Sequence, residues 1–304
     1  MTVADRWIDL LDPTPEELNS HLPPSIHARA MEQLLAPSTH DDDPRPKLEG
    51  HGDYIFGVLL VAVDIPDEDL VFYQELNLIM TRDTLLTVRK TPAGGRSPYD
   101  PSPARSSCRD HDSIGMMVYH LLDDIAERFL DLVDALTDEI EELEQGIDQW
   151  DPDRIRRRIS ELRHDMLNIR RTLSPLRDSV RQVVDDRIDF EGDEVFTRDV
   201  ELNFAAVYDK LLRSTDGIDL ARDLVAGARD YHQAKIANDQ NDVMKRLTVI
   251  ASVLLLPTFI VGLYGQNFVD MPELRWHDGY AYGWGLIIVT TFAQLAFFRW
   301  KKWL

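Results

Sequence analysis

Two apolar segments near the end of the chain restrict its fold more than any other feature. Residues 247–264 form eighteen consecutive positions without a charged side chain, and residues 283–298 form sixteen, of which Gln294 is the most polar. Each segment is close to the lower limit of the roughly 20 residues that a helix needs to cross the hydrocarbon core of a bilayer. The sequence therefore predicts two membrane-spanning helices.

The residues that flank these segments indicate an orientation. Lys245 and Arg246 precede the first segment, and the basic stretch 299–303 follows the second. Basic residues favour the cytoplasmic side, so we expect both chain termini in the cytoplasm and the protein in the plasma (inner) membrane. The segment between the two spans carries Asp270, Glu273, Arg275 and Asp278. Aromatic side chains typical of a membrane interface occur at Tyr264, Tyr282, Trp284, Trp300 and Trp303.

The composition of the whole chain excludes one class of partner. The formal net charge is −21, and binding of nucleic acid needs clustered Lys and Arg, so we expect no nucleic-acid partner. An acidic surface is compatible with cations as ligands, although it also serves solubility. Cys108 is the single cysteine, which excludes an intrachain disulfide and fits a reducing compartment. The N-terminus does not resemble a signal peptide.

The first part of the chain, residues 1–110, is expected to form a cytoplasmic α/β domain. Apolar and β-branched runs predict strands at 54–63, 75–80 and 84–89, and a short helix is expected to begin at Pro13. The stretch 91–107 is rich in Pro, Gly and Ser, which favours a loop.

Helical periodicity dominates residues 111–192. Apolar residues recur at three- and four-residue steps on either side of Asp151–Pro152, which indicates a charged antiparallel helical hairpin with a new helix starting at Pro152. Pro175 lies inside the second helix and is expected to kink or interrupt it.

A third helix is expected from residue 193 to residue 264, so that a long stalk continues into the first span. Pro257 lies in an apolar stretch where membrane helices tolerate proline. A break near Gly217 or Gly227 is the alternative.

Signatures of catalysis are absent from the sequence. No P-loop, nucleophile elbow or zinc-protease motif occurs, so we expect no enzyme and no resident cofactor. The acidic run 41–43 and His111, which lies between Asp110 and Asp112, are expected to be solvated loop residues.

Small and polar residues follow one face of the first predicted span. Such a face suits helix–helix packing in a membrane, and it equally suits the lining of a pore built from several copies of the helix. The residues of this stripe are Asn241, Met244, Thr248, Ala251, Leu255, Thr258 and Gly262, with Leu247 beside them.

Directly after this span the sequence resembles a known family. The run Tyr264-Gly-Gln-Asn-Phe268, followed by Met271-Pro-Glu273, is similar to the Tyr-Gly-Met-Asn-Phe…Met-Pro-Glu signature of the CorA-type magnesium and divalent-cation transporters. Residues 241–248, Pro257 and Gly262 fit the first span of that family, and Arg45-Pro-Lys47 precedes a strand as in its members. The outer loop is expected at 265–282, the second span at 283–298 and a basic cytoplasmic tail at 299–304.

The resemblance implies a funnel-shaped homopentamer with an α+β cytoplasmic domain, long helices and two C-terminal transmembrane helices. It implies Mg²⁺ influx down the electrochemical gradient through a pore lined by the first spans. Asn267 would form a ring of amides at the outer mouth, where Gly265 ends the helix, and Thr258 would form a polar ring deeper inside. Leu255 shares this face. The resemblance further implies a hydrophobic constriction of the pore at Met244 and Leu247, and a cytoplasmic exit of the pore at Asn241. Basic charge around this exit would come from Lys245, Lys301 and Lys302.

One residue departs from the signature. Gln266 stands where the family has methionine, which leaves the identity of the transported ion open between Mg²⁺ and zinc, cobalt or nickel. Transport of the latter ions includes coupling to protons as an alternative. Mg²⁺ is favoured because no cluster of His or Cys follows the predicted path. A non-conducting, membrane-anchored sensor or scaffold is a further alternative. The carboxylates of regulatory metal sites are not identifiable from the sequence.

Overall fold

A computed structural model describes residues 2–37, 44–65, 70–92, 96–188, 190, 195–266, 268 and 271–303. The chain forms two compact units, residues 1–228 and 229–304. The first holds all the strands, and the second holds both apolar segments.

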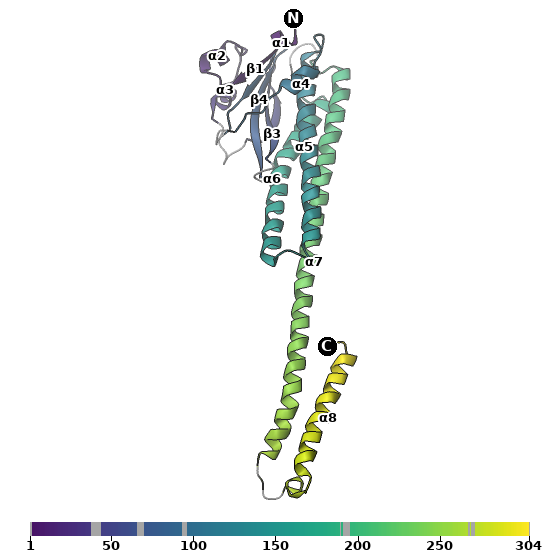
Figure 1. Cartoon of the computed structure of the whole chain (residues 1–304). Helices are drawn as coiled ribbons and strands as arrows, with labels where there is room; N and C mark the ends of the chain where they lie inside the picture. Colours follow the sequence, from purple (N-terminus) through teal and green to yellow (C-terminus); the bar gives the residue numbers. More distant parts are fainter. Residues whose placement is uncertain are drawn as a thin grey trace. The chain divides into compact units, whose positions relative to one another are not determined.

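A five-stranded sheet lies in the first unit (Figure 1). Its order is β1-β5-β4-β3-β2. All neighbours are antiparallel except β1 and β5, which are parallel. The three predicted strands are present with shifted ends, whereas β1 and β2 were not predicted. The strands are β1 (Trp7–Leu11), β2 (Lys47–Gly50), β3 (Ile55–Ile65), β4 (Leu70–Met80) and β5 (Leu85–Arg89).

Alternating side chains of β3 bury the two faces of this sheet against different helices. Phe56 and Val58 pack with Leu18 of α2 (Pro15–Asn19) and with Ala30 and Leu34 of α3 (Ala28–Leu35), whereas Leu59 and Val61 join the core formed with α5 (Ile114–Gly146). The period of two of a β-strand produces this division. The sheet is thus the middle layer between short helices and the long ones.

The predicted helical hairpin is present as α5 and α6 (Pro152–Val184). The Ser113 hydroxyl caps α5 by accepting from the Met116 amide at 3.2 Å, and the Asp151 carboxylate caps α6 by accepting from the Asp153 amide at 2.8 Å. The expected loop at 91–107 was wrong in part, because α4 (Ser102–Ser107) occupies its end. A further short helix, α1 (Val3–Arg6), precedes β1.

Of the two expected effects of Pro175, a kink or an interruption, the interruption does not occur, because α6 is continuous through this residue. A proline inside a helix costs about 3 kcal/mol, because it removes one hydrogen bond and crowds the preceding turn. The neighbouring Leu173, Leu176 and Val180 are fully buried, and burial of each contributes about 2 kcal/mol. Packing therefore outweighs the local cost.

The third long helix, α7 (Arg198–Tyr264), is continuous past both Gly217 and Gly227. This helix was predicted to start at residue 193, which lies outside the described residues, and it begins at Arg198. A Cβ on Gly217 would lie 2.5 Å from Cγ1 of Val133, so this glycine permits close packing on α5 rather than breaking the helix. Phe204, Val207 and Leu211 of α7 belong to the same core as the sheet and the hairpin. The three segments 1–110, 111–192 and the start of 193–264 therefore share one core instead of forming separate domains.

The second unit contains the C-terminal part of α7, the 3₁₀ turn η1 (Pro272–Arg275) and α8 (Gly279–Trp300). Each of α7 and α8 has a window long and apolar enough to cross a membrane, and almost none of either window is buried within the chain. The second span was expected at 283–298, but α8 begins four residues earlier, at Gly279, and includes Arg299 and Trp300. The predicted outer loop 265–282 is correspondingly shorter.

Candidate functional site

The polar and small-residue stripe of α7 is exposed along its whole length. Asn241, Thr248, Ala251, Thr258 and Gly262 are all exposed. The larger apolar members of the stripe are exposed as well: Met244 is 60% exposed, Leu247 58% and Leu255 70%. A Cβ on Gly262 would meet no atom within 4 Å, so nothing within the chain requires a glycine there.

The opposite face of α7 packs against α8. Val249 is 4% exposed and Ile260 7%, and between them the Gln294 side-chain amide on α8 donates to the Ser252 carbonyl oxygen at 3.1 Å. At about 100° of rotation per residue, Val249 and Ile260 lie across the helix from Ala251, Leu255 and Thr258. The stripe is therefore not the surface that joins the two helices of one chain.

The two hydroxyls of the stripe present oxygen lone pairs outward. The Thr248 hydroxyl donates to the Met244 carbonyl at 2.8 Å, and the Thr258 hydroxyl donates to the Leu254 carbonyl at 2.7 Å. A hydroxyl has one proton and two lone pairs, so each of these oxygens retains acceptor capacity. The exposed face can therefore accept hydrogen bonds from water, including water that surrounds a cation.

At the end of the stripe α7 turns. The Gly265 amide donates to the Val261 carbonyl at 2.9 Å, and the Gln266 amide donates to the Leu263 carbonyl at 3.3 Å. A Cβ on Gly265 would lie 3.1 Å from that same Val261 oxygen, a tight contact that favours glycine here. Gln266 and Phe268 are exposed, whereas Asn267 lies outside the described residues.

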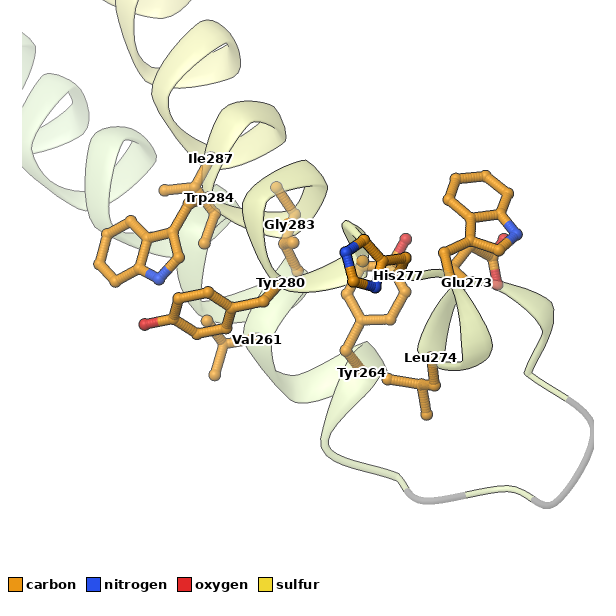
Figure 2. Close-up of a pocket in the computed structure, with 12 residues that line it drawn as sticks. Val261, Tyr264, Glu273, Leu274, His277, Tyr280, Gly283, Trp284 and Ile287 are labelled. Atoms are coloured by element: carbon orange, nitrogen blue, oxygen red, sulfur yellow. The ribbon is translucent and has the colours of Figure 1, made fainter.

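The chain then folds back around an apolar cavity of about 520 Å³. Figure 2 shows its lining side chains, which come from the end of α7, from η1 and from the start of α8. Trp276 packs edge-on against Tyr282, with 5.4 Å between the ring centroids. Gly279 is required, because a Cβ there would lie 2.4 Å from the Glu273 carbonyl. The lining residues His277 and Tyr280 were not predicted as part of the site, and the aromatic-rich sequence 276–284 was the available signal.

Of the predicted outer-loop residues, Tyr264 and Glu273 line this cavity. Pro272 is the first residue of η1, and Met271 immediately precedes that turn. Phe268 is 65% exposed and is not among the lining residues.

The predicted basic residues differ in their surroundings. Lys245 forms an ion pair with Asp242 at 2.9 Å, and this lysine, by hydrogen bond and charge, holds the pKa of the Asp242 carboxyl below its usual value. The Lys301 ammonium lies 5.0 Å from the Trp300 ring centroid, and Lys302 is exposed. The positive charge of Lys245 is thus partly balanced within its own helix.

Outside the membrane segments, three potential metal ligands come together. The ligand atoms of Cys108, Asp112 and His120 all lie within 4.8 Å of one another. His111, noted in the sequence beside Asp112, is exposed and not part of this group. The acidic run 41–43 lies outside the described residues. Burial, with the charge of Asp112, raises the pKa of the Cys108 thiol to about 11.

Comparisons with known proteins cover nearly the whole chain. A family model described as CorA-like Mg²⁺ transporter protein matches residues 5–302. The chain is 28% identical over 285 residues to the cobalt/magnesium transport protein CorA of Thermotoga maritima, covering 92% of this chain and 77% of that protein.

Two solved structures are similar over most of their length. The CorA magnesium transporter of Methanocaldococcus jannaschii has a TM-score of 0.76 at 22% identity and covers 98% of this chain and 91% of its own. The full-length CmaX protein has a TM-score of 0.65 at 19% identity and covers 98% of this chain and 88% of its own. The predicted α+β domain followed by long helices and two apolar C-terminal helices is thereby confirmed.

Proposed function

The chain belongs to the CorA-like Mg²⁺ transporter family, and from this premise we propose that it forms a homopentameric pore for Mg²⁺ in the inner membrane. It is a divalent-cation transporter and not an enzyme. We further propose that both termini lie in the cytoplasm, that the ion enters down its electrochemical gradient, and that the protein needs no resident cofactor.

The exposed stripe of α7 is the observation that carries this proposal. One helix cannot enclose a channel, but copies arranged around an axis can do so when each turns the same face inward. The stripe is free for this, because Val249, Ile260 and the Ser252–Gln294 hydrogen bond lie elsewhere on the helix. Its small and polar residues distinguish it from the other exposed side chains of the segment 247–264, which are apolar. In this arrangement α8 lies outside α7, toward lipid.

The chemistry of the stripe and its outer end suits a hydrated ion. Mg²⁺ gives up its water reluctantly and usually keeps several water molecules. Neutral oxygens of Thr258, Gln266 and Asn267 accept hydrogen bonds from those waters without binding the ion too tightly for release. Residues 241–268 contain no His or Cys, so this path lacks the softer ligands that favour zinc.

The cytoplasmic half of the stripe is suited to gating. Met244 and Leu247 are exposed apolar side chains one turn apart, and in a ring they would form a constriction that closes by loss of water. Asn241 would lie at the exit. Lys301 and Lys302 would surround that exit with positive charge, while Lys245 contributes less because Asp242 neutralises it.

The membrane potential supplies a driving force. Each elementary charge that crosses 100 mV contributes about 2.3 kcal/mol, and a divalent ion therefore gains about 4.6 kcal/mol. Influx consequently requires neither a covalent step nor a coupled ion.

Uptake into proteoliposomes tests the proposal. Purified protein is reconstituted, and flux of Mg²⁺, Zn²⁺, Co²⁺ and Ni²⁺ is compared with and without a proton gradient, with protein-free vesicles as the control. We expect Mg²⁺ flux that follows its own gradient and the membrane potential. Zinc flux that depends on the proton gradient would contradict Mg²⁺ as the cargo, and absence of all flux would contradict a conducting pore.

A further inference from the structure

Cys108, Asp112 and His120 form a compact group in the first unit. Cys108 follows the last residue of α4, Asp112 lies in the connection 108–113, and His120 lies in the second turn of α5. His120 Nε2 is 3.5 Å from an Asp112 carboxylate oxygen, and all three ligand atoms lie within 4.8 Å of one another. Each residue is half-buried, which leaves a route for an ion.

The local structure holds these side chains in place. An Asp112 carboxylate oxygen accepts from the Arg109 amide at 2.8 Å, and the Arg6 guanidinium donates to the Asp112 main-chain carbonyl at 2.7 Å. The Cys108 amide donates to the Arg105 carbonyl at 3.2 Å. The guanidinium of Arg6 therefore engages the main chain of Asp112. Hydrogen bonds of this kind orient metal ligands.

We propose that Cys108, Asp112 and His120 bind one borderline-soft divalent ion, of the class of Zn²⁺ or Co²⁺, at a site separate from the conduction path. In a tetrahedral zinc site, bond lengths of about 2.0–2.3 Å place neighbouring ligand atoms about 3.4 Å apart. The His120–Asp112 separation already matches this value, and the thiol needs a shift of at most about 1.6 Å to reach the same distance from both.

The charges of the group favour a divalent ion. On binding, the thiol releases its proton to solvent, and the thiolate and the carboxylate together balance two positive charges while the imidazole stays neutral. A water molecule completes four-coordination. Mg²⁺ is disfavoured, because it prefers six oxygen ligands in an octahedral arrangement. The site thus selects a class of ion different from that favoured by the stripe of α7.

Cobalt is a direct probe of this site, because thiolate coordination produces a sulfur-to-cobalt charge-transfer absorption. Cys108 is the single cysteine of the chain, so such a band reports on this residue alone. Full-length protein in detergent, freed of metal by a chelator, is titrated with Co²⁺. We expect the band to saturate near one Co²⁺ per chain, to disappear on addition of Zn²⁺ and to persist in a large excess of Mg²⁺.

Variants separate the site from adventitious binding. We expect Cys108→Ser to abolish the band, and His120→Ala and Asp112→Asn each to weaken cobalt affinity at least about tenfold, which is the effect of losing about 1.4 kcal/mol of binding free energy. His111→Ala is the matched control, since this exposed histidine lies in the same connection, and it should leave the titration unchanged. An unchanged cobalt affinity in both His120→Ala and Asp112→Asn would overturn the proposal.

A second measurement needs no substitution. Alkylation of Cys108 in the unaltered full-length protein is timed in the presence of Zn²⁺ or of Mg²⁺. Zn²⁺ should slow the reaction at least about tenfold, because it coordinates the thiolate and so blocks its alkylation. Mg²⁺ should leave the rate unchanged, because it does not bind thiolate ligands. Equal rates with both ions would overturn the proposal. Neither measurement involves ion flux, so its outcome is independent of whether the pore conducts.

Discussion

The side-chain amide of Gln294 on α8 donates a hydrogen bond of 3.1 Å to the main-chain carbonyl of Ser252 on α7. This contact, together with the burial of Val249 and Ile260, identifies the face of α7 that the second span covers. It leaves the face with Thr258 and Leu255 exposed. The proposed roles of individual side chains follow from this division.

Removal of the Thr258 hydroxyl should reduce transport. Thr258→Val keeps the shape of the side chain but removes the exposed oxygen, and the loss of one hydrogen bond of about 1 kcal/mol to the ion's water shell predicts a fall in Mg²⁺ flux of about fivefold. Thr290→Val is the matched control, because the Thr290 hydroxyl donates to the Leu286 carbonyl at 2.7 Å on α8 in the same way. Equal losses of flux in the two variants would remove Thr258 from the pore.

Asn267 is predicted to be essential for uptake. Asn267→Ala removes the amide proposed to form the ring at the outer mouth, and we expect Mg²⁺ flux into proteoliposomes to be abolished while assembly, measured by light scattering in detergent, is unchanged. Unaltered uptake would exclude the amide ring from the mechanism.

Gln266 is predicted to tune ion preference. Gln266→Met exchanges an amide for the thioether of the family signature, which changes the hydrogen bonds offered to the ion's water shell. Competition between Mg²⁺ and Co²⁺ flux should shift more than the maximal rate of either ion. An unchanged preference would identify glutamine as a neutral variant at this position.

Gly279 is predicted to be required for the outer connection. A methyl group there would lie 2.4 Å from the Glu273 carbonyl, so Gly279→Ala should displace η1 and cost about 1–3 kcal/mol. Thermal unfolding in detergent and uptake measure the effect. Gly285→Ala, whose Cβ would meet no atom within 4 Å, is the control and should be neutral. Similar losses in both variants would indicate a general effect of helix glycines instead.

Long-range contacts account for the elements that could not be predicted. The strand β1 is short and contains Asp9, whose carboxylate pairs with Arg89 of β5 at 2.6 Å across the sheet. That polar residue weakens the apolar pattern of a strand, and its partner is distant in the sequence. The continuity of α6 through Pro175 likewise depends on burial of Leu173 and Leu176, which local propensity does not include.

The candidate sites also differ in whether the sequence could predict them. The stripe from Met244 to Gly262 was predictable, because the 3.6-residue period of a helix places its members on one face wherever the helix lies. The cavity around Tyr264 and Glu273 was not, because it depends on how residues 271–279 fold back.

The sequence by itself determined the two membrane spans, the hairpin and the family, because hydrophobic length, helical period and a short motif are local properties of the chain. Only the tertiary structure decided which face of α7 meets α8, and that Asp112 lies beside His120 and not His111. The first depends on packing between two separate helices, and the second on how the connection 108–113 is held beside α5, where the Arg6 guanidinium, distant in the sequence, donates to the Asp112 carbonyl.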